Sequence, residues 1–165
     1  MTTYHNKLVR DGIIDKILRG GETADWRPLS ADEFLPRLVE KLAEESEELE
    51  KAQEPKDVLS ECADVLEVWR ELERRCVIYP DASVHTPELY DADSSHLRRR
   101  IFVRATGIAG SERARYAELL TGFYWALISL ARAEGLSFAQ IESARQEKRL
   151  RVGGFEKKIL LISTG

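Results

Sequence analysis

The stretch "EKLAEESEELE", from Glu40 to Glu50, holds six glutamates and one lysine in eleven residues. It belongs to a helical pattern that opens at the capping box "SADE", with Ser30 as N-cap and Glu33 three residues later. Glutamates four residues apart repel each other and weaken an isolated helix by roughly 0.2–0.5 kcal/mol per pair. The stretch is therefore either a solvated helix face or a site that requires positive charge.

A helical wheel separates these glutamates into two groups. At about 100° per residue, Glu45 falls inside the apolar stripe formed by Leu38, Leu42, Leu49 and Ala52. Glu48 lies roughly 60° to one side, and Glu44 lies further round the same edge. The outer arc carries Glu40, Glu47 and Glu50. We expect this first helix to end near Ala52, with Glu45 and Glu48 turned away from its solvated face.

A second helix, from about 57 to 75, repeats the pattern. Glu61 falls inside the stripe formed by Val58, Val65, Val68 and Leu72, and Asp64 flanks it three residues on. The proline-containing turn between the two helices is short, which favours antiparallel neighbours. The sequence therefore predicts that Glu45 and Glu48 face Glu61 and Asp64.

Four such carboxylates resist joint ionisation, because burial and mutual repulsion both oppose it. Oxygen ligands without histidine suit hard cations such as Mg²⁺ or Mn²⁺. A di-iron site of the ferritin type needs Glu-x-x-His motifs, which are not formed by His5, His85 or His96. In the alternative interpretation, Glu45 and Glu61 face the ends of the bundle and are neutralised by lysines such as Lys41 and Lys51.

The remaining patterns favour an all-α fold, a helical bundle. The stretch "NKLVRDGIIDKILRGG" is typical of a helix that stops at Gly20-Gly21. We expect an irregular insertion over about 76–111, with one short helix near 95–104. Ser111 is placed to cap a long helix ending at Gly135. A second capping box, Ser137 with Gln140, opens a last helix that stops at Gly153-Gly154, and a short extended tail follows.

The composition indicates one soluble globular domain covering residues 1–165. Of the 165 residues, 43% are hydrophobic and 33% charged, and the net charge of −4 does not favour nucleic-acid binding. Cys62 and Cys76 predict no disulfide framework. The first residues have no apolar signal region, and no apolar run is long enough to span a membrane. We expect a cytoplasmic protein that binds neither nucleic acid nor membrane.

Four motifs together resemble a known family. They are "YHNKLVRDGIIDKI", "KLAEESEELE", "SECADVLEV" and "ARQEKRLRVGGFEKKILL". In this order they resemble the ExxE…ExxD pattern and the two chain ends of MazG-like all-α nucleoside triphosphate pyrophosphohydrolases. The resemblance covers residues 4–18, 30–72 and 126–161, and omits the stretch from about 75 to 120.

The resemblance implies a house-cleaning enzyme that hydrolyses a nucleoside triphosphate, canonical or non-canonical, ribo or deoxy, to the monophosphate and pyrophosphate. It implies Mg²⁺ (or Mn²⁺) bound by Glu45, Glu48, Glu61 and Asp64, and a metal-activated water that attacks the α-phosphorus. Glu44 matches an extra leading glutamate that positions or deprotonates this water. The predicted substrate contacts are Lys7, Arg10, Lys148, Arg151 and Phe155.

One position departs from the family. A basic residue usually precedes the terminal Gly-Gly, where this chain has Val152, so the contact is expected to shift to Arg151 or Arg149. The basic run "HLRRRIFVR" is interpreted as a solvated or dimer-facing segment, in preference to an extra phosphate or nucleotide contact that reaches over the site. Aromatic candidates for base stacking are Trp69 and the run Phe123–Trp125, whose more common role is core packing.

The resemblance leaves alternatives open. Phosphoribosyl-ATP pyrophosphohydrolase resembles the same bundle, although "NKLVRD" and "GGFEK" argue against it. A non-catalytic helical binding protein, whose acids serve solubility, is the alternative from a different class. We expect a homodimer, with higher homo-oligomers also open.

Overall fold

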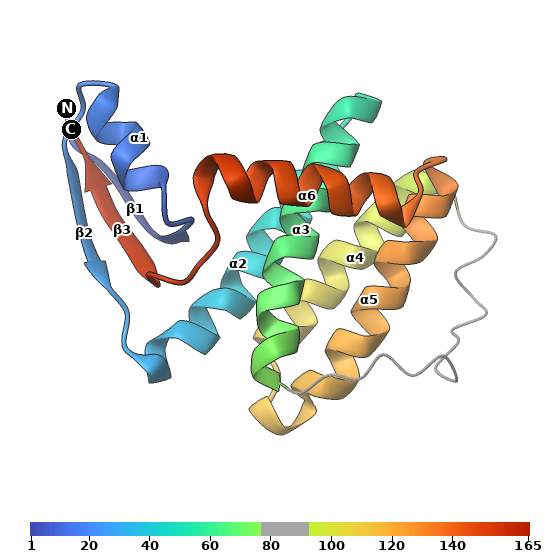
Figure 1. The fold of residues 1–165 in the computed structure, drawn as a ribbon. Coiled ribbons are helices and arrows are strands. Elements are labelled where there is room, and N and C mark those ends of the chain that lie inside the picture. Colours follow the sequence, from blue (N-terminus) through green and yellow to red (C-terminus); the bar gives the residue numbers. More distant parts are fainter. Residues whose placement is uncertain (77–92) are drawn as a thin grey trace.

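The fold consists of a helical bundle with a small sheet beside it (Figure 1). The structure is a computed structural model that describes residues 1–76 and 93–165. Its elements, in chain order, are β1 (Thr3–Val9), α1 (Ile13–Arg19), β2 (Ala24–Pro28), α2 (Ala31–Lys51), α3 (Pro55–Cys76), α4 (Ser94–Ala109), a 3₁₀ turn (Arg113–Arg115), α5 (Tyr116–Ala133), α6 (Phe138–Val152) and β3 (Ile159–Thr164).

The two helices that carry the acids form as predicted. Ser30 caps α2 through a complete capping box with Glu33, and α2 ends one residue before Ala52. The helix predicted over 57–75 is α3, which packs along α2 after a turn of three residues. This antiparallel pairing is what brings the acids of the two helices together.

The second half of the chain completes the bundle. Helix α4 is longer than predicted and packs against α2 and α5, because it buries one face formed by Leu97, Ile101, Ala105 and Ile108. Half of the expected insertion is thus a core helix, while the irregular part expected at 77–92 lies outside the described residues. Ser137 caps α6 with Gln140 as predicted. The prediction that Ser111 caps the next helix is wrong. The Ser111 hydroxyl donates to the Gly107 carbonyl oxygen over 2.6 Å, and α5 begins only after the 3₁₀ turn.

A purely all-α fold is also wrong, because the two chain ends form an antiparallel sheet in the order β1-β3-β2. The tail predicted to be extended becomes β3, the central strand. The stretch predicted as one helix from residue 6 divides into β1 and α1. Leu8 faces the bundle core and Val9 packs against α1, so neighbouring apolar residues are buried on opposite faces of a covered strand.

The edge strand β1 also has an irregularity before Lys7. The pairing of β1 with β3 shifts register between Tyr4 and Lys7, and Asn6 has a positive φ of 46°. Bulges of this kind redirect side chains and are frequent next to functional sites. Figure 1 shows the sheet and α1 on one side of the bundle, with α6 crossing over α3 before the chain enters β3.

Candidate metal centre

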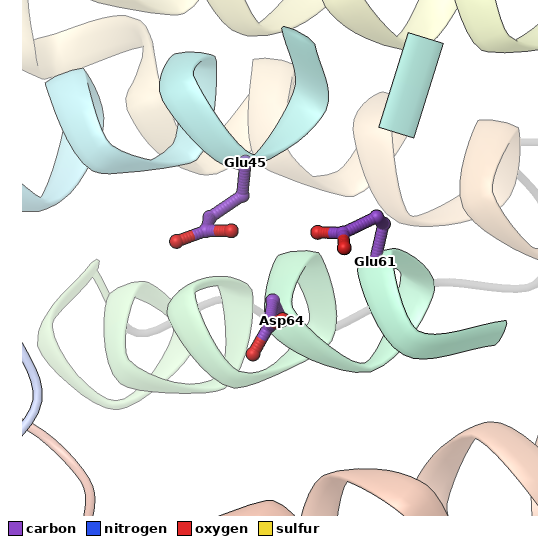
Figure 2. Close-up of side chains that lie close together, drawn as sticks. All are labelled: Glu45, Glu61 and Asp64. Carbon is purple, nitrogen blue, oxygen red and sulfur yellow. The ribbon is translucent and has the colours of Figure 1, made fainter. Parts of the chain in front are cut away.

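Three carboxylates meet where α2 packs against α3. Glu45 comes from α2, and Glu61 and Asp64 come from successive turns of α3 (Figure 2). Each side chain offers one oxygen atom, and these atoms all lie within 4.8 Å of one another. Carboxylate oxygens at such spacing suit Mg²⁺ or Mn²⁺. These three residues could therefore hold a metal ion.

Burial makes two of these carboxylates reluctant to ionise. Glu45 is only 7% exposed, and its burial raises the pKa of its carboxyl group, although Lys41 opposes the shift. Burial, followed by repulsion from Asp64, raises the pKa of Glu61 to about 7. Glu61 Oε2 is buried and has no hydrogen-bond partner within residues 1–76 and 93–165. A cation at this position would supply what the oxygen lacks, so the residues fit a metal ion.

Basic side chains surround the carboxylates. Arg10 Nη2 donates to Asp64 Oδ1 over 2.6 Å, and Lys148 donates to Asp64 Oδ2 and to the Ser60 carbonyl oxygen. On α2, Lys41 Nζ lies 2.6 Å from Glu45 Oε1. The lysine neutralisation expected in the alternative interpretation is thus real at Glu45.

Glu44 belongs to the same network. Its Oε1 lies 3.0 Å from Lys41 Nζ and 3.4 Å from Lys7 Nζ. The other lysine named in the alternative interpretation, Lys51, pairs with Glu47 on the solvated face instead. Lys7, in β1, therefore links the sheet to the acidic edge of α2.

A cavity of about 500 Å³ opens in front of the cluster. Its wall is built by β1, α1, β3, α2, α3 and α6, so that bundle and sheet both contribute. Most of the residues predicted from the sequence line it, namely Lys7, Arg10, Glu44, Glu45, Glu48, Asp64, Lys148 and Arg151. The volume falls within the range of about 300–1,000 Å³ typical of small-molecule sites.

Three predicted residues differ from the rest. Glu61 belongs to the close group of carboxylates but does not line the cavity. Glu48 lines the cavity but is exposed, and it lies outside the close group of three. Phe155 does not line the cavity: it is 1% exposed in the main core, where the Arg10 guanidinium lies 5.8 Å from its ring centroid. It supports Arg10 instead of facing a ligand.

The structure also places the other basic and aromatic candidates. Arg149 pairs with Glu67 and Glu156, away from the cavity wall, whereas Val152 contributes to that wall. Trp69 is fully buried and donates its indole N–H to the Leu120 carbonyl oxygen. The expectation that such aromatic residues serve the core is confirmed for Trp69, and Phe123 is buried in the same core.

The basic run of α4 contacts the C-terminal end of α2. Arg99 pairs with Glu50 over 2.9 Å, and Arg98 donates to the Ala52 carbonyl oxygen. None of the residues that line the cavity in the described ranges belongs to α4. The run contacts Glu50 and the end of α2, rather than the candidate site.

Sequence reasoning missed one part of the site. Opposite the acids, the cavity wall is formed by His5, Val9, Ile13, Ile17, Glu22, Leu161 and Thr164. The spacing of two between His5, Lys7 and Val9 is typical of one strand face, and it was the available signal. The interpretation of this stretch as one helix obscures the alternation, because it places Leu8 and Val9 on a helix.

Comparison of the chain with protein-family models, with curated proteins and with solved structures finds no match. The family resemblance therefore stays a prediction, and the function is argued from the site. Within the described residues, none of the helices combines the length and apolar character that crossing a membrane requires.

Proposed function

We propose that the protein hydrolyses a nucleoside triphosphate to the monophosphate and pyrophosphate in a Mg²⁺-dependent reaction. The observation that carries the proposal is the cluster of Glu45, Glu61 and Asp64 beside a cavity with a basic wall. Carboxylates suit the metal, and the neighbouring lysines and arginines suit phosphate oxygens. The same motifs support the proposal through their family resemblance.

The chain's own residues have distinct roles in this reaction. Glu45, Glu61 and Asp64 would hold the ion, and Glu48 is a further carboxylate on the cavity wall. When bound, Mg²⁺ would neutralise charge on the phosphoryl oxygens and lower the pKa of the attacking water. Glu44, which already accepts from two lysines, would orient that water.

The basic residues would bind the triphosphate. The guanidinium of Arg10 and the ammonium groups of Lys148 and Lys7 lie in the cavity wall, where they can donate to phosphate oxygens. Water adds to the α-phosphorus, the bond from that phosphorus to the bridging oxygen breaks, and pyrophosphate leaves. Positive charge from these side chains would stabilise the negative charge that develops on the phosphoryl oxygens and on the leaving pyrophosphate.

A non-catalytic binding protein is the second candidate. The observation that favours it is the pairing of Asp64 with Arg10 and Lys148, and of Glu45 with Lys41. These ion pairs neutralise most of the cluster without a metal. The Oε2 atom of Glu61 argues against this alternative, because it has no partner among the described residues and most buried polar atoms in proteins have one.

The test is an incubation with a panel of ribo- and deoxyribonucleoside triphosphates, in Mg²⁺ or in EDTA, with products separated by anion exchange. We expect monophosphate and pyrophosphate in Mg²⁺ only. Asp64→Asn should lower the rate by about 100-fold or more, because even indirect metal contacts are worth about 10–100-fold. The matched control is Glu40→Gln. This exposed glutamate of α2 pairs with Arg37 and does not line the cavity, so the variant should keep full activity.

Turnover to diphosphate and phosphate would contradict the proposed bond cleavage. Absence of turnover for every nucleotide, together with no Mg²⁺-dependent rise in Tm, would favour the binding protein, since a ligand of the folded state must raise Tm.

A further inference from the structure

The cavity has an apolar arm that the proposed chemistry does not use. Its floor is formed by Val9 and Leu161 of the sheet, and its side by Ile13 and Ile17, one turn apart on α1. Neither helix residue is fully buried, so both retain surface toward the cavity. A half-open apolar wall next to a cluster of charges is typical of a site that takes an amphipathic small molecule.

The arm leads away from the acids in a defined direction. Arg10 marks the acidic end through its bond to Asp64, and Val9, Lys7 and His5 follow backwards along β1. At about 3.3 Å per residue, His5 lies roughly 15 Å from Arg10 along the strand. This distance is comparable with the length of a nucleotide.

Helix α1 runs the same way on the other side of the arm. It starts beside Arg10, where the Ile13 N–H donates to the Arg10 carbonyl oxygen, and it ends toward Glu22, whose N–H donates to the Ile17 carbonyl oxygen. The far end of the arm is polar again. His5 Nε2 lies 3.0 Å from Thr164 Oγ1, and the side chain of Glu22 lies in the same cavity wall.

We propose that this arm holds the nucleoside of the substrate, with the base lying over the apolar surface that Ile13, Ile17 and the sheet present to the cavity, and its edge toward His5 and Glu22. The inference rests on the proposed function and deepens it. The triphosphate then lies at the acidic end, and Lys7, midway along β1, lies between the two parts of the ligand. The order charged, apolar, polar along the cavity matches the order phosphate, ring, ring edge in a nucleotide.

The chemistry of the far end sets what the edge of the base must offer. The Glu22 carboxylate only accepts hydrogen bonds, so it favours base edges rich in N–H donors over edges rich in acceptors. Trp69, Phe123 and Phe155 are closed off in the core and cannot stack on the base. Recognition therefore relies on apolar contact with α1 and on few polar groups, as in most small-molecule sites.

The test measures binding of nucleoside monophosphates, the products, by isothermal titration calorimetry in Mg²⁺. Ile17→Trp fills the arm and should weaken monophosphate binding by about 10-fold or more, while pyrophosphate binding changes by less than about twofold. The matched control is Leu18→Trp, at the neighbouring residue that is 52% exposed and does not line the cavity. It should change neither affinity.

A second measurement leaves the fold untouched. In the wild-type protein with labelled isoleucine methyl groups, nuclear Overhauser effects should join the base protons to Ile13 and Ile17.

Glu22→Gln, on the exposed rim, should alter the affinity ranking among bases by about threefold or more. An unchanged ranking would overturn the role of Glu22.

The two proposals fail separately. Monophosphate that binds in the arm without any turnover of triphosphates would keep the arm and overturn the hydrolase. Turnover with no effect of Ile17→Trp on monophosphate binding, and no contacts to α1, would overturn the arm and keep the hydrolase. Equal weakening of monophosphate and pyrophosphate binding by Ile17→Trp would also overturn the arm.

Discussion

At the scale of single residues, two buried glutamates meet different surroundings. Glu45 has a cation 2.6 Å away on its own helix, and the same contact raises the pKa of Lys41 although burial alone would lower it. Among the described residues, Glu61 has no cation in direct contact, and its Oε2 atom accepts no hydrogen bond. The pKa of both acids is raised, but Glu61 has only the more distant Lys148 to oppose the shift.

Glu61 should therefore make stability depend on pH. Its pKa in the folded protein is about 7, above the ordinary value of 4.5. The folded protein keeps this proton up to about pH 7, while the unfolded chain loses it near pH 4.5. The free energy of unfolding thus decreases as the pH rises through this window.

We expect Glu61→Gln to stabilise the metal-free protein at high pH. In EDTA at pH 8 the gain should be about 1 kcal/mol, a discounted value because the side chain is partly exposed. This corresponds to a Tm rise of about 2–4 °C, and the rise should nearly vanish at pH 5. Thermal unfolding followed by circular dichroism at both pH values measures it.

The response of Tm to Mg²⁺ distinguishes the loss of the Glu61 charge from a simple repacking of the site. The ion should raise the Tm of the wild-type protein at pH 8 and raise that of Glu61→Gln much less, because the variant lacks a charged ligand. Glu54→Gln, an exposed position just before α3, serves as control and should behave as wild type. A gain for Glu61→Gln that is equal at pH 5 and pH 8 would contradict the assigned pKa.

At the scale of elements, the position of α6 depends on one buried carboxylate. Glu67 of α3 is fully buried and accepts from both Arg145 and Arg149 of α6. Between these arginines on the helix lies Lys148, which reaches Asp64. The two ion pairs of Glu67, here called the clamp at Glu67, therefore fix the position of α6 and, with it, the position of Lys148 in the candidate site.

We expect Glu67→Gln to cost about 2–3 kcal/mol. This is less than the 3–5 kcal/mol typical of a stranded buried charge, because Arg145 and Arg149 keep second partners in Glu142 and Glu156. The Tm should fall by about 4–12 °C. Denaturant unfolding gives the free energy directly.

The matched control is Glu73→Gln, six residues along the same helix. Glu73 pairs with Arg70 in a partly exposed i,i+3 contact of 2.9 Å, and its loss should cost about 0.5 kcal/mol or less. If both variants lost the same free energy, the clamp at Glu67 would have no special weight.

The elements that the sequence predicted well are those with long, regular periodicity. The apolar stripes around Glu45 and Glu61 extend over several turns, so α2, α3 and the acids that meet between them followed from spacing alone. β2 was not predicted, because "ADWRP" has no period and forms a strand only through its pairing with β3. Local sequence contains no information about such a partner.

At the scale of the whole molecule, the lack of information about distant partner strands also explains why the sequence did not predict the apolar half of the cavity. The metal cluster depends on α2 and α3, which are neighbours in the chain. The arm of the cavity depends on β1 pairing with β3, in which Thr3 lies opposite Thr164. The sequence does not say which strand pairs with which across the full length of the chain, so the short alternation of His5, Lys7 and Val9 could not place His5 beside Ile17.

This division of the site predicts what removal of β3 does. A chain ending at Lys158 loses the central strand, including Ile159, Leu160 and Leu161, each 3% exposed. Burying each side chain contributes about 1.5–3 kcal/mol, so the sheet and α1 should lose their order. The bundle has its own core in α2–α5 and should keep its helices.

The truncated chain should then lose one function and keep the other. Monophosphate binding should disappear with the arm, whereas Mg²⁺ should still raise the Tm, because Glu45, Glu61 and Asp64 all belong to α2 and α3. Calorimetry measures monophosphate binding, circular dichroism measures the helices and their Tm with and without Mg²⁺, and hydrogen exchange measures the order of the sheet and α1. A chain ending at Thr164 serves as control. A helical truncated chain that no longer responds to Mg²⁺ would mean that the sheet, through Arg10, is part of the metal centre itself.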